Sequence, residues 1–164
     1  MPWIRGLIFT LLVPVMIGIG IPELLSPDRQ WAGGNWQIGW LPVAVGSAFY
    51  LSCLMRFLAA GGTPAIFFTE PLRFLIGKEP SRLVSHGLYR FSRNPMYVGV
   101  ISVVFGQALL FKSSALAWYG AALCVMFHLV VVLQEEPHLR KTQGEEYEKY
   151  CRTVPRWIGY RGRR

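Results

Sequence analysis

The chain has 164 residues, of which 52% are hydrophobic and only 16% are charged, and its mean hydropathy is +0.34. This composition excludes an ordinary water-soluble domain, because several apolar runs reach the roughly 20 residues that a helix needs to cross a bilayer. The net charge of +8 does not indicate a nucleic-acid partner, since the basic residues lie between and after the apolar runs, where they orient a membrane protein.

We therefore predict an all-α, polytopic membrane protein, with about four transmembrane helices and a C-terminal amphipathic helix in a single domain, residues 1–164. Residues 1–60 are predicted to hold two spans. The first run, 4–25, lacks a small-x-small cleavage motif after it, so we expect a membrane helix rather than a cleaved signal peptide. The second run, 38–60, carries Arg56, whose side chain is expected to reach the interface. A contact between Arg56 and an acceptor headgroup is the alternative.

A polar, basic stretch, residues 86–97, leads from the loop 61–93 into the third apolar run. Asn94 followed by Pro95 is typical of a helix start, with asparagine as the N-cap and proline in the first turn. Such a helix N-terminus at the membrane edge favours a small anion such as a carboxylate. A plain loop-to-helix junction is the other interpretation of these residues taken alone.

The third and fourth apolar runs are predicted to form a helical hairpin in the membrane. Residues 96–111 make the shorter helix and residues 115–133 the longer one, with a tight turn at 112–114. His128 is a lone polar residue in the longer helix, and we expect it to be packed or hydrogen-bonded rather than catalytic. The three cysteines of the chain have neither a metal-binding spacing nor an even-numbered disulfide framework.

Two adjacent carboxylates, Glu135 and Glu136, follow the fourth apolar run. We expect the helix to end there, with Pro137 breaking it, which places both carboxylates at the unfavourable end of the helix dipole. A cationic ligand, or arginines from the loop 61–93, would offset that cost. Solvated glutamates are the simpler alternative.

The last predicted element is an amphipathic helix over residues 140–154. Its spacing places three residues on one face and allows two ion pairs four residues apart. The face consists of Tyr147, Tyr150 and Val154, and the pairs are Glu145–Lys149 and Glu148–Arg152.

Counts of lysine and arginine set the predicted orientation. The loop 61–93 carries five and residues 134–164 carry eight, whereas residues 26–37 carry one. We therefore expect the loop, the C-terminal part and both chain termini on the cytoplasmic side of the inner membrane. The start of the third helix and the glutamate pair then meet at one end of the hairpin, where a zwitterionic ligand with a second positive centre would satisfy both.

Four motifs follow one another in residues 80–158, namely Gly87-Leu-Tyr89, Arg93-Asn-Pro-Met-Tyr97-Val-Gly99, Glu135-Glu136 and Gly144-Glu-Glu-Tyr147…Tyr150…Val154-Pro155. In these motifs the chain resembles the isoprenylcysteine carboxyl methyltransferase family, and phospholipid N-methyltransferases are similar at the same places. The resemblance implies an integral-membrane enzyme that uses S-adenosylmethionine without a Rossmann fold and requires no metal. Residues 80–158 would form its cofactor-binding core.

The resemblance also implies which residues contact the cofactor. They are Ser81, Arg82, Leu83 and Val84 at the pocket entrance, Tyr89 against the cofactor, Asn94, Pro95, Met96 and Tyr97 at the helix start, and Glu135 facing a positive group. No catalytic residue is assigned. Methyl transfer from a sulfonium requires mainly that the protein position the acceptor and exclude water.

Two departures from the family pattern bear on the acceptor. Asn94 stands where prenylcysteine enzymes have histidine, so this position holds no general base. Residues 130–133 are Val-Val-Val-Leu, where the resemblance to those enzymes implies a substrate-binding arginine. We therefore expect a lipophilic acceptor, either a lipid amine or a small isoprenoid-type molecule, with a prenylcysteine carboxyl group as the alternative. An NADPH-dependent sterol-type reductase and a non-enzymatic membrane protein are the competing functions.

Overall fold

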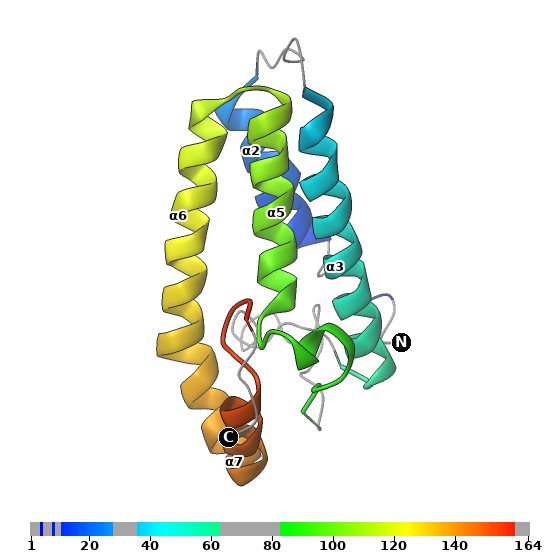
Figure 1. Ribbon diagram of the computed structural model, residues 1–164, viewed down its shortest axis with the longest axis vertical. Helices are drawn as coiled ribbons and strands as arrows, with labels where there is room; N and C mark the ends of the chain where they lie inside the picture. The colour runs from blue at the N-terminus through cyan, green and yellow to red at the C-terminus, as the bar shows by residue number, and fades with distance from the viewer. Residues whose placement is uncertain (1–3, 5–7, 9–10, 28–35, 63–82, 160–164) are drawn as a thin grey trace.

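The computed structural model describes residues 4, 8, 11–27, 36–62 and 83–159, and this described part is helical and contains no strand (Figure 1). The all-α prediction is confirmed for these residues. Two of the described helices, Gln37–Ala59 and the continuous Ser114–Thr153, are long and apolar enough to cross a membrane. Two shorter apolar helices, Val13–Leu25 and Pro95–Leu110, accompany them. The number of four spans stays a prediction.

Three helices form the centre of the molecule, and their bounds lie within a few residues of those predicted. Helix α3 (Trp40–Ala59) follows a 3-10 turn, Trp36–Gly39. Helix α5 (Pro95–Leu110) and helix α6 (Ser114–Val130) form the predicted hairpin. The hydroxyl of Ser113 caps α6 by accepting a hydrogen bond from the backbone N–H of Leu116 at 3.3 Å.

The N-terminal helical segment packs beside this hairpin. A π-helical stretch, Leu11–Gly20, leads into α2 (Ile21–Leu25). Two backbone carbonyls of the π-helical stretch accept hydrogen bonds from the hairpin. Gln107 Nε2 donates to the carbonyl of Gly18, and the Tyr119 hydroxyl donates to the carbonyl of Ile17 at 3.0 Å. Irregular backbone in an apolar environment needs such partners for its carbonyl groups. The rest of the predicted first helix lies largely outside the described residues.

Helices α3 and α5 approach each other along pairs of glycines. A Cβ atom built on Gly99 would lie 2.7 Å from the carbonyl oxygen of Gly46, and one built on Gly106 would lie 2.8 Å from that of Gly39. Gly99 and Gly106 are seven residues apart in α5, and Gly46 of α3 lies seven residues after Gly39, the N-cap of α3, so each pair lies on one face. Small residues allow two membrane helices to pack at short distance. We call this contact the glycine seam.

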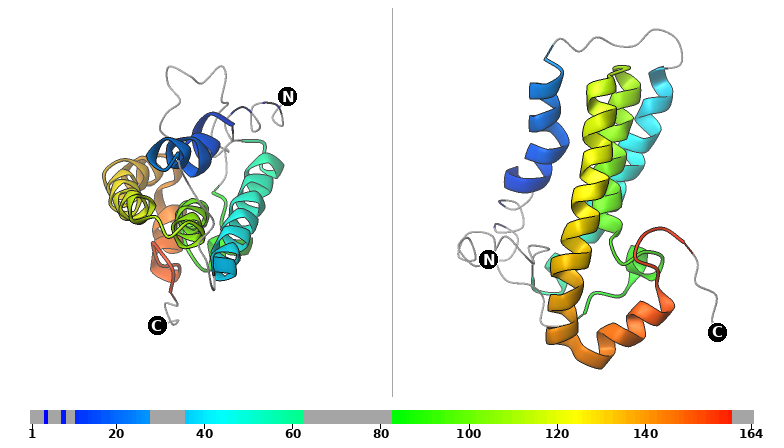
Figure 2. Two further views of the ribbon diagram at one scale, coloured as in Figure 1. Left: turned by 90° about the horizontal axis from the view of Figure 1, so that it is seen from above. Right: turned by 90° about the vertical axis from the view of Figure 1, so that its left-hand side faces the viewer.

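The end of α6 differs from the prediction. The helix does not stop at the glutamate pair but continues through a π-helical turn, Val131–Glu135, into α7 (Glu136–Thr153). Pro137 lies in the first turn of α7, where a missing N–H is tolerated, so it does not break the helix. The first residues of α7 continue α6, and the chain changes direction at Gly144, so the second half of α7 turns away from the axis of α6 (Figure 2). The predicted argument from a free helix C-terminus is therefore wrong.

Two clusters of buried side chains form the core. One joins α3, α5 and α6 and consists of Tyr50, Leu54, Leu58, Val100, Val104, Leu123 and Phe127. The other joins α3, the segment before α5 and α7, and consists of Cys53, Phe57, Tyr89, Tyr147, Tyr150 and Val154. The predicted inner face of the amphipathic helix is thereby confirmed. Met96 packs against both clusters, so the start of α5 lies between them.

Candidate functional site at the start of helix α5

The start of α5 has the predicted position but not the predicted capping bond. Asn94 occupies the N-cap position and Pro95 the first turn, yet the Asn94 side chain does not cap the helix. Its Nδ2 atom instead donates to the backbone carbonyl of Arg156 at 2.9 Å. The hydroxyl of Ser92 accepts a hydrogen bond from the Asn94 backbone N–H at 3.1 Å. The helix start is therefore fixed from outside, by the C-terminal segment of the chain.

The two glutamates have different surroundings. Glu135 is 7% exposed and accepts a hydrogen bond from the Tyr97 hydroxyl. The ring of Tyr97 stacks on Phe127 at a centroid distance of 4.5 Å, which fixes the position of the hydroxyl. Among the described residues, no lysine or arginine forms an ion pair with Glu135. The site therefore contains one buried carboxylate whose charge the described protein does not match.

Glu136, by contrast, is surrounded by arginines and is 3% exposed. Arg156 binds it with two nitrogens, Nε at 2.6 Å from Oε1 and Nη2 at 3.0 Å from Oε2. Arg93 approaches Oε1 at 3.1 Å and Arg140 approaches Oε2 at 3.4 Å. The hydrogen bond to Glu136 raises the pKa of Arg156 above its already high ordinary value. The expectation that loop arginines meet the glutamate pair is confirmed for Arg93.

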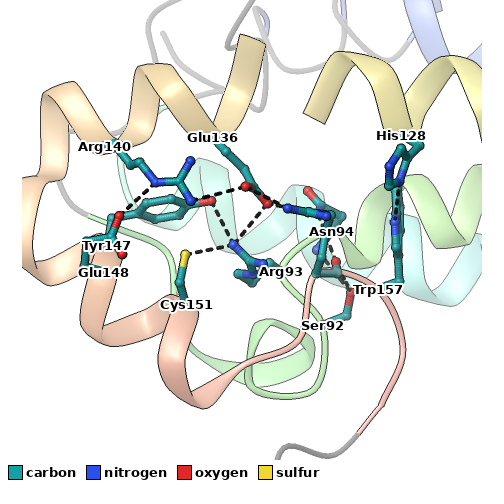
Figure 3. Close-up of polar contacts among 11 residues, drawn as sticks. Ser92, Arg93, Asn94, His128, Glu136, Arg140, Tyr147, Glu148, Cys151 and Trp157 are labelled. Atoms are coloured by element: carbon teal, nitrogen blue, oxygen red, sulfur yellow. Dashed lines mark hydrogen bonds and ion pairs between the residues drawn. The ribbon is translucent and has the colours of Figure 1, made fainter. Parts of the chain in front are cut away.

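The side chain of Arg93 connects Glu136, at the start of α7, to Tyr147 and Cys151 in the second half of that helix (Figure 3). Its Nη1 atom donates to the Cys151 sulfur at 2.8 Å and to the Tyr147 hydroxyl at 3.3 Å, in addition to the ion pair with Glu136. The side chain is only 9% exposed, and its Nε atom is buried without a hydrogen-bond partner among the described residues. A guanidinium held on several sides in this way fixes the loop before α5 against α7.

Contacts of α7 and the segment after it complete the site. The Tyr150 hydroxyl donates to the backbone carbonyl of Tyr89 at 2.6 Å. Burial raises the pKa of Tyr89 well above its ordinary value, so this phenol stays neutral. His128 accepts a hydrogen bond from the Trp157 indole at 3.2 Å, which confirms the prediction of a hydrogen-bonded histidine.

One of the two predicted ion pairs of α7 is correct. The Glu145–Lys149 pair forms at 3.7 Å, on exposed side chains. Glu148 instead pairs with Arg140 at 2.8 Å, so the predicted pairing with Arg152 is wrong. The cause is Gly144, whose φ of 51° and ψ of −126° interrupt the helix between Arg140 and Glu148. This kink turns the two halves of α7 toward each other.

The structure brings together most of the sequence-predicted site residues. Asn94, Pro95, Met96, Tyr97 and Glu135 lie at the start of α5 and the end of the α6 π turn. Leu83 and Val84 pack with Tyr89 in the second core cluster, which Met96 also contacts. Ser81 and Arg82 lie outside the described residues. The cofactor contacts themselves stay a prediction.

Two residues that build the site, Ser92 and Arg156, were not predicted, and Arg93 was predicted only as one of the loop arginines. Ser92, Arg93 and Arg156 supply most of the bonds around Asn94 and Glu136. Arg93 stood within a quoted motif and among the loop arginines expected to meet the glutamate pair, but its bonds to α7 were not predicted. For Arg156 the available signal was chemical, since an acidic pair next to an apolar helix requires cations, and Arg156 is the first of several arginines that follow α7 in the sequence.

Comparison with known proteins gives two matches. The family model of phospholipid methyltransferase matches residues 38–146. The curated methanethiol S-methyltransferase of Crocosphaera subtropica (strain ATCC 51142 / BH68) is 31% identical over 85 residues, which cover 52% of this chain and 32% of that relative. The chain thus spans about a third of the relative's length. No solved structure matches this chain.

Proposed function

We propose a function from the premise that this chain belongs to the phospholipid methyltransferase family. The chain acts as an integral membrane methyltransferase that transfers a methyl group from S-adenosylmethionine to a lipophilic acceptor at the cytoplasmic interface. Its single domain covers residues 1–164, with the cofactor-binding core in residues 80–158. The match of a curated S-methyltransferase to half of the chain supports the reaction class.

The observation that carries this proposal is the difference between Glu135 and Glu136. Glu136 is neutralised by arginines, whereas Glu135 is equally buried and has Tyr97 as its partner among the described residues. A buried carboxylate without a matching cation is costly. The ammonium or sulfonium of S-adenosylmethionine supplies such a cation, so the donor set fits the cofactor.

The neighbouring charges fit the rest of the same molecule. Arg93, Arg140 and Arg156 face Glu136 and Glu148, so three positive charges meet two negative ones and one positive charge is in excess. This excess lies beside the N-terminus of α5, which also favours an anion. A carboxylate is attracted to this side and an ammonium to Glu135, so the two sides suit a zwitterionic amino acid group.

When bound, the cofactor supplies an activated methyl group. The residues of the chain then have three tasks. Tyr97 holds the Glu135 carboxylate through its hydroxyl, and its ring is held by Phe127. The buried side chains of both core clusters exclude water from the start of α5. The Asn94 side chain donates a hydrogen bond to the backbone carbonyl of Arg156 and has no titrating group. Its task is therefore to hold the start of α5 in position, and it does not accept a proton.

A groove on the surface of the hairpin supports a lipophilic acceptor. It has a volume of about 440 Å³ and is lined by Ile101, Cys124, Val125, His128, Leu129 and Trp157. Ile101 lies one turn after Tyr97 on α5, and His128 directly follows Phe127, so the groove adjoins the residues around Glu135. Arg140 and Arg156, which would otherwise be available for a carboxylate acceptor, are bound to Glu136. This argues against a prenylcysteine acceptor.

A small thiol is the second candidate acceptor, because the matched curated relative is named for methanethiol. The proposed topology serves either acceptor: four spans, with both termini and the start of α5 on the cytoplasmic side. Single cysteines introduced at positions 33 and 160 into a cysteine-free background test it. Labelling of position 160 from outside intact cells by a membrane-impermeant thiol reagent would overturn the topology.

The decisive experiment is a titration of the purified chain in lipid nanodiscs with S-adenosylmethionine and, separately, with NADPH. We expect saturable binding of the first and none of the second, and the reverse result would favour a sterol-type reductase. Methyl transfer from labelled cofactor is then measured to phosphatidylethanolamine, a farnesyl-cysteine analogue and methanethiol. Efficient ester formation on the farnesyl-cysteine alone would refute the proposed acceptor class.

A further inference from the structure

The segment after α7, residues 154–157, turns back toward the start of α5 (Figures 1 and 2). Its backbone is hydrogen-bonded there at several points. The carbonyl of Pro155 accepts a hydrogen bond from the Arg93 backbone N–H at 3.0 Å, and the carbonyl of Arg156 accepts one from Asn94 Nδ2 at 2.9 Å. Two successive carbonyls of this segment therefore hold two successive residues before α5.

The side chain of Arg156 holds the opposite wall of the site. Its guanidinium binds both oxygens of Glu136, at 2.6 and 3.0 Å, and is 33% exposed. Parallel bonds of this kind fix direction as well as distance, and only a planar guanidinium forms them. One residue thus ties Asn94 through its backbone and Glu136 through its side chain.

We infer that Arg156 is a positioning residue of the cofactor site, acting through Asn94 and Glu136. Tyr97 lies one turn after the Asn94 position and Glu135 directly precedes Glu136. By fixing both neighbours, Arg156 sets the distance at which Tyr97 holds the Glu135 carboxylate. This inference rests on the proposed function, and it adds to the site a residue beyond the 38–146 match to the family.

Arg140 provides the matched comparison, since it is a second arginine on the same carboxylate. It approaches Glu136 with one nitrogen, at 3.4 Å, its side chain is 46% exposed, and it is shared with Glu148. Removing either side chain removes the same charge from Glu136. Only the change at Arg156 removes the bidentate contact to Glu136, so a difference between the two variants measures geometry rather than charge.

The test compares R156K, R156A and R140Q with the unchanged chain in nanodiscs. We measure the Kd for S-adenosylmethionine by calorimetry, and the unfolding midpoint without cofactor. We expect R156A to weaken binding about tenfold or more and R140Q about threefold or less, because R156A loses two parallel charge-assisted bonds to Glu136 and R140Q loses a single longer one. R156K keeps the positive charge but cannot form the two parallel bonds to Glu136. We expect it to bind S-adenosylmethionine several-fold more weakly and to unfold near the midpoint of the unchanged chain.

Chemical rescue separates positioning from general stability. Added methylguanidine is expected to restore much of the cofactor affinity of R156A, because the free guanidinium occupies the vacated position on Glu136. Unaltered affinity in R156K together with failed rescue of R156A would overturn the inference, as would equal losses in R156A and R140Q. An unchanged chain that does not bind S-adenosylmethionine would instead overturn the proposed function, so the two failures are distinguishable.

Discussion

The body of helix α5 and its N-terminal end are stabilised by different kinds of interaction. Along its length, the glycine seam packs Gly99 and Gly106 directly against the backbone of α3. At its N-terminal end, Asn94 and the residues before it are held by hydrogen bonds and by the arginines around Glu136. The seam therefore depends on the absence of side-chain volume, and the polar end depends on matched charge. A larger side chain is therefore expected to disrupt the glycine seam, whereas a lost charge is expected to disrupt the N-terminal end of α5 even when the side chain keeps its size.

This difference separates a scaffold from a binding site. The glycine seam is a packed contact between apolar helix faces, so it offers no charged group to an ionic ligand. The polar end has Glu135 left with Tyr97 alone among the described residues, beside a fully matched Glu136. Glu136 has arginine partners and Glu135 has none among the described residues, so Glu135 is where we place the cation of a ligand. The predictions below change one end or the other.

The largest effect is expected at the matched charge. Glu136→Gln keeps the shape of the side chain but leaves Arg93, 9% exposed, without its ion-pair partner. Breaking a buried pair by removing one partner costs about 3–5 kcal/mol, so we expect a loss of this order in the free energy of unfolding. Glu145→Gln, on a side chain that is 92% exposed, is the control and should change stability by less than about 0.5 kcal/mol. Equal stability of the two variants in chemical unfolding would contradict the assigned role of Glu136.

The unmatched charge is expected to affect binding rather than folding. Glu135→Gln should weaken S-adenosylmethionine binding by about 1.5–3 kcal/mol, because a charge-assisted contact to the cofactor is lost. Glu148→Gln also removes one carboxylate, but from a side chain that is 48% exposed and paired with Arg140. We expect it to change the Kd little. Equal effects of both changes in a calorimetric titration would show that the cofactor site is misplaced.

At the glycine seam the expected effect is one of size. A Cβ on Gly99 would lie 2.7 Å from the Gly46 carbonyl oxygen, whereas one on Gly18 would have no atom within 4 Å. Gly99→Ala should therefore destabilise the chain by about 1–3 kcal/mol through overpacking. Gly18→Ala should be neutral or slightly stabilising, because alanine favours helix more than glycine does. Similar unfolding midpoints for the two variants in the same lipid would argue against the seam.

Local patterns predicted the helices but not the partners of the polar groups. Apolar runs placed α3, α5 and α6 because long continuous apolar stretches are typical of helices that cross a membrane. The continuation of α6 into α7 was missed because Pro137 suggests a stop, although proline fits a first turn after a π turn. The Arg140–Glu148 pair was missed because the positive φ of Gly144 changes the helical register.

The candidate site was predicted from its motif residues, and its supporting bonds were not. Asn94, Tyr97 and Glu135 were recognised because residues of these types in this order resemble a family. Arg156 lies 20 residues from Glu136 and 62 from Asn94 in the sequence. No local period connects residues at such separations, so the contacts follow only from the tertiary fold. This is why the helix start was assigned a capping bond that the structure replaces with a bond to Arg156.

The smallest effect tests whether the Tyr97 hydroxyl serves the site or the fold. Tyr97→Phe keeps the ring on Phe127 and removes only the hydrogen bond to Glu135. Tyr119→Phe is the matched control, because it removes one hydroxyl bonded to the Ile17 carbonyl at 3.0 Å. Each change should lower the free energy of unfolding by about 0.5–1.5 kcal/mol. Only Tyr97→Phe should also weaken S-adenosylmethionine binding, several-fold, since Glu135 is then free to leave the position in which it meets the cofactor. If titrations of the two variants give the same Kd, the Tyr97 hydroxyl contributes to folding only. The bond between Tyr97 and Glu135 then gives the N-terminal end of α5 no role in cofactor binding.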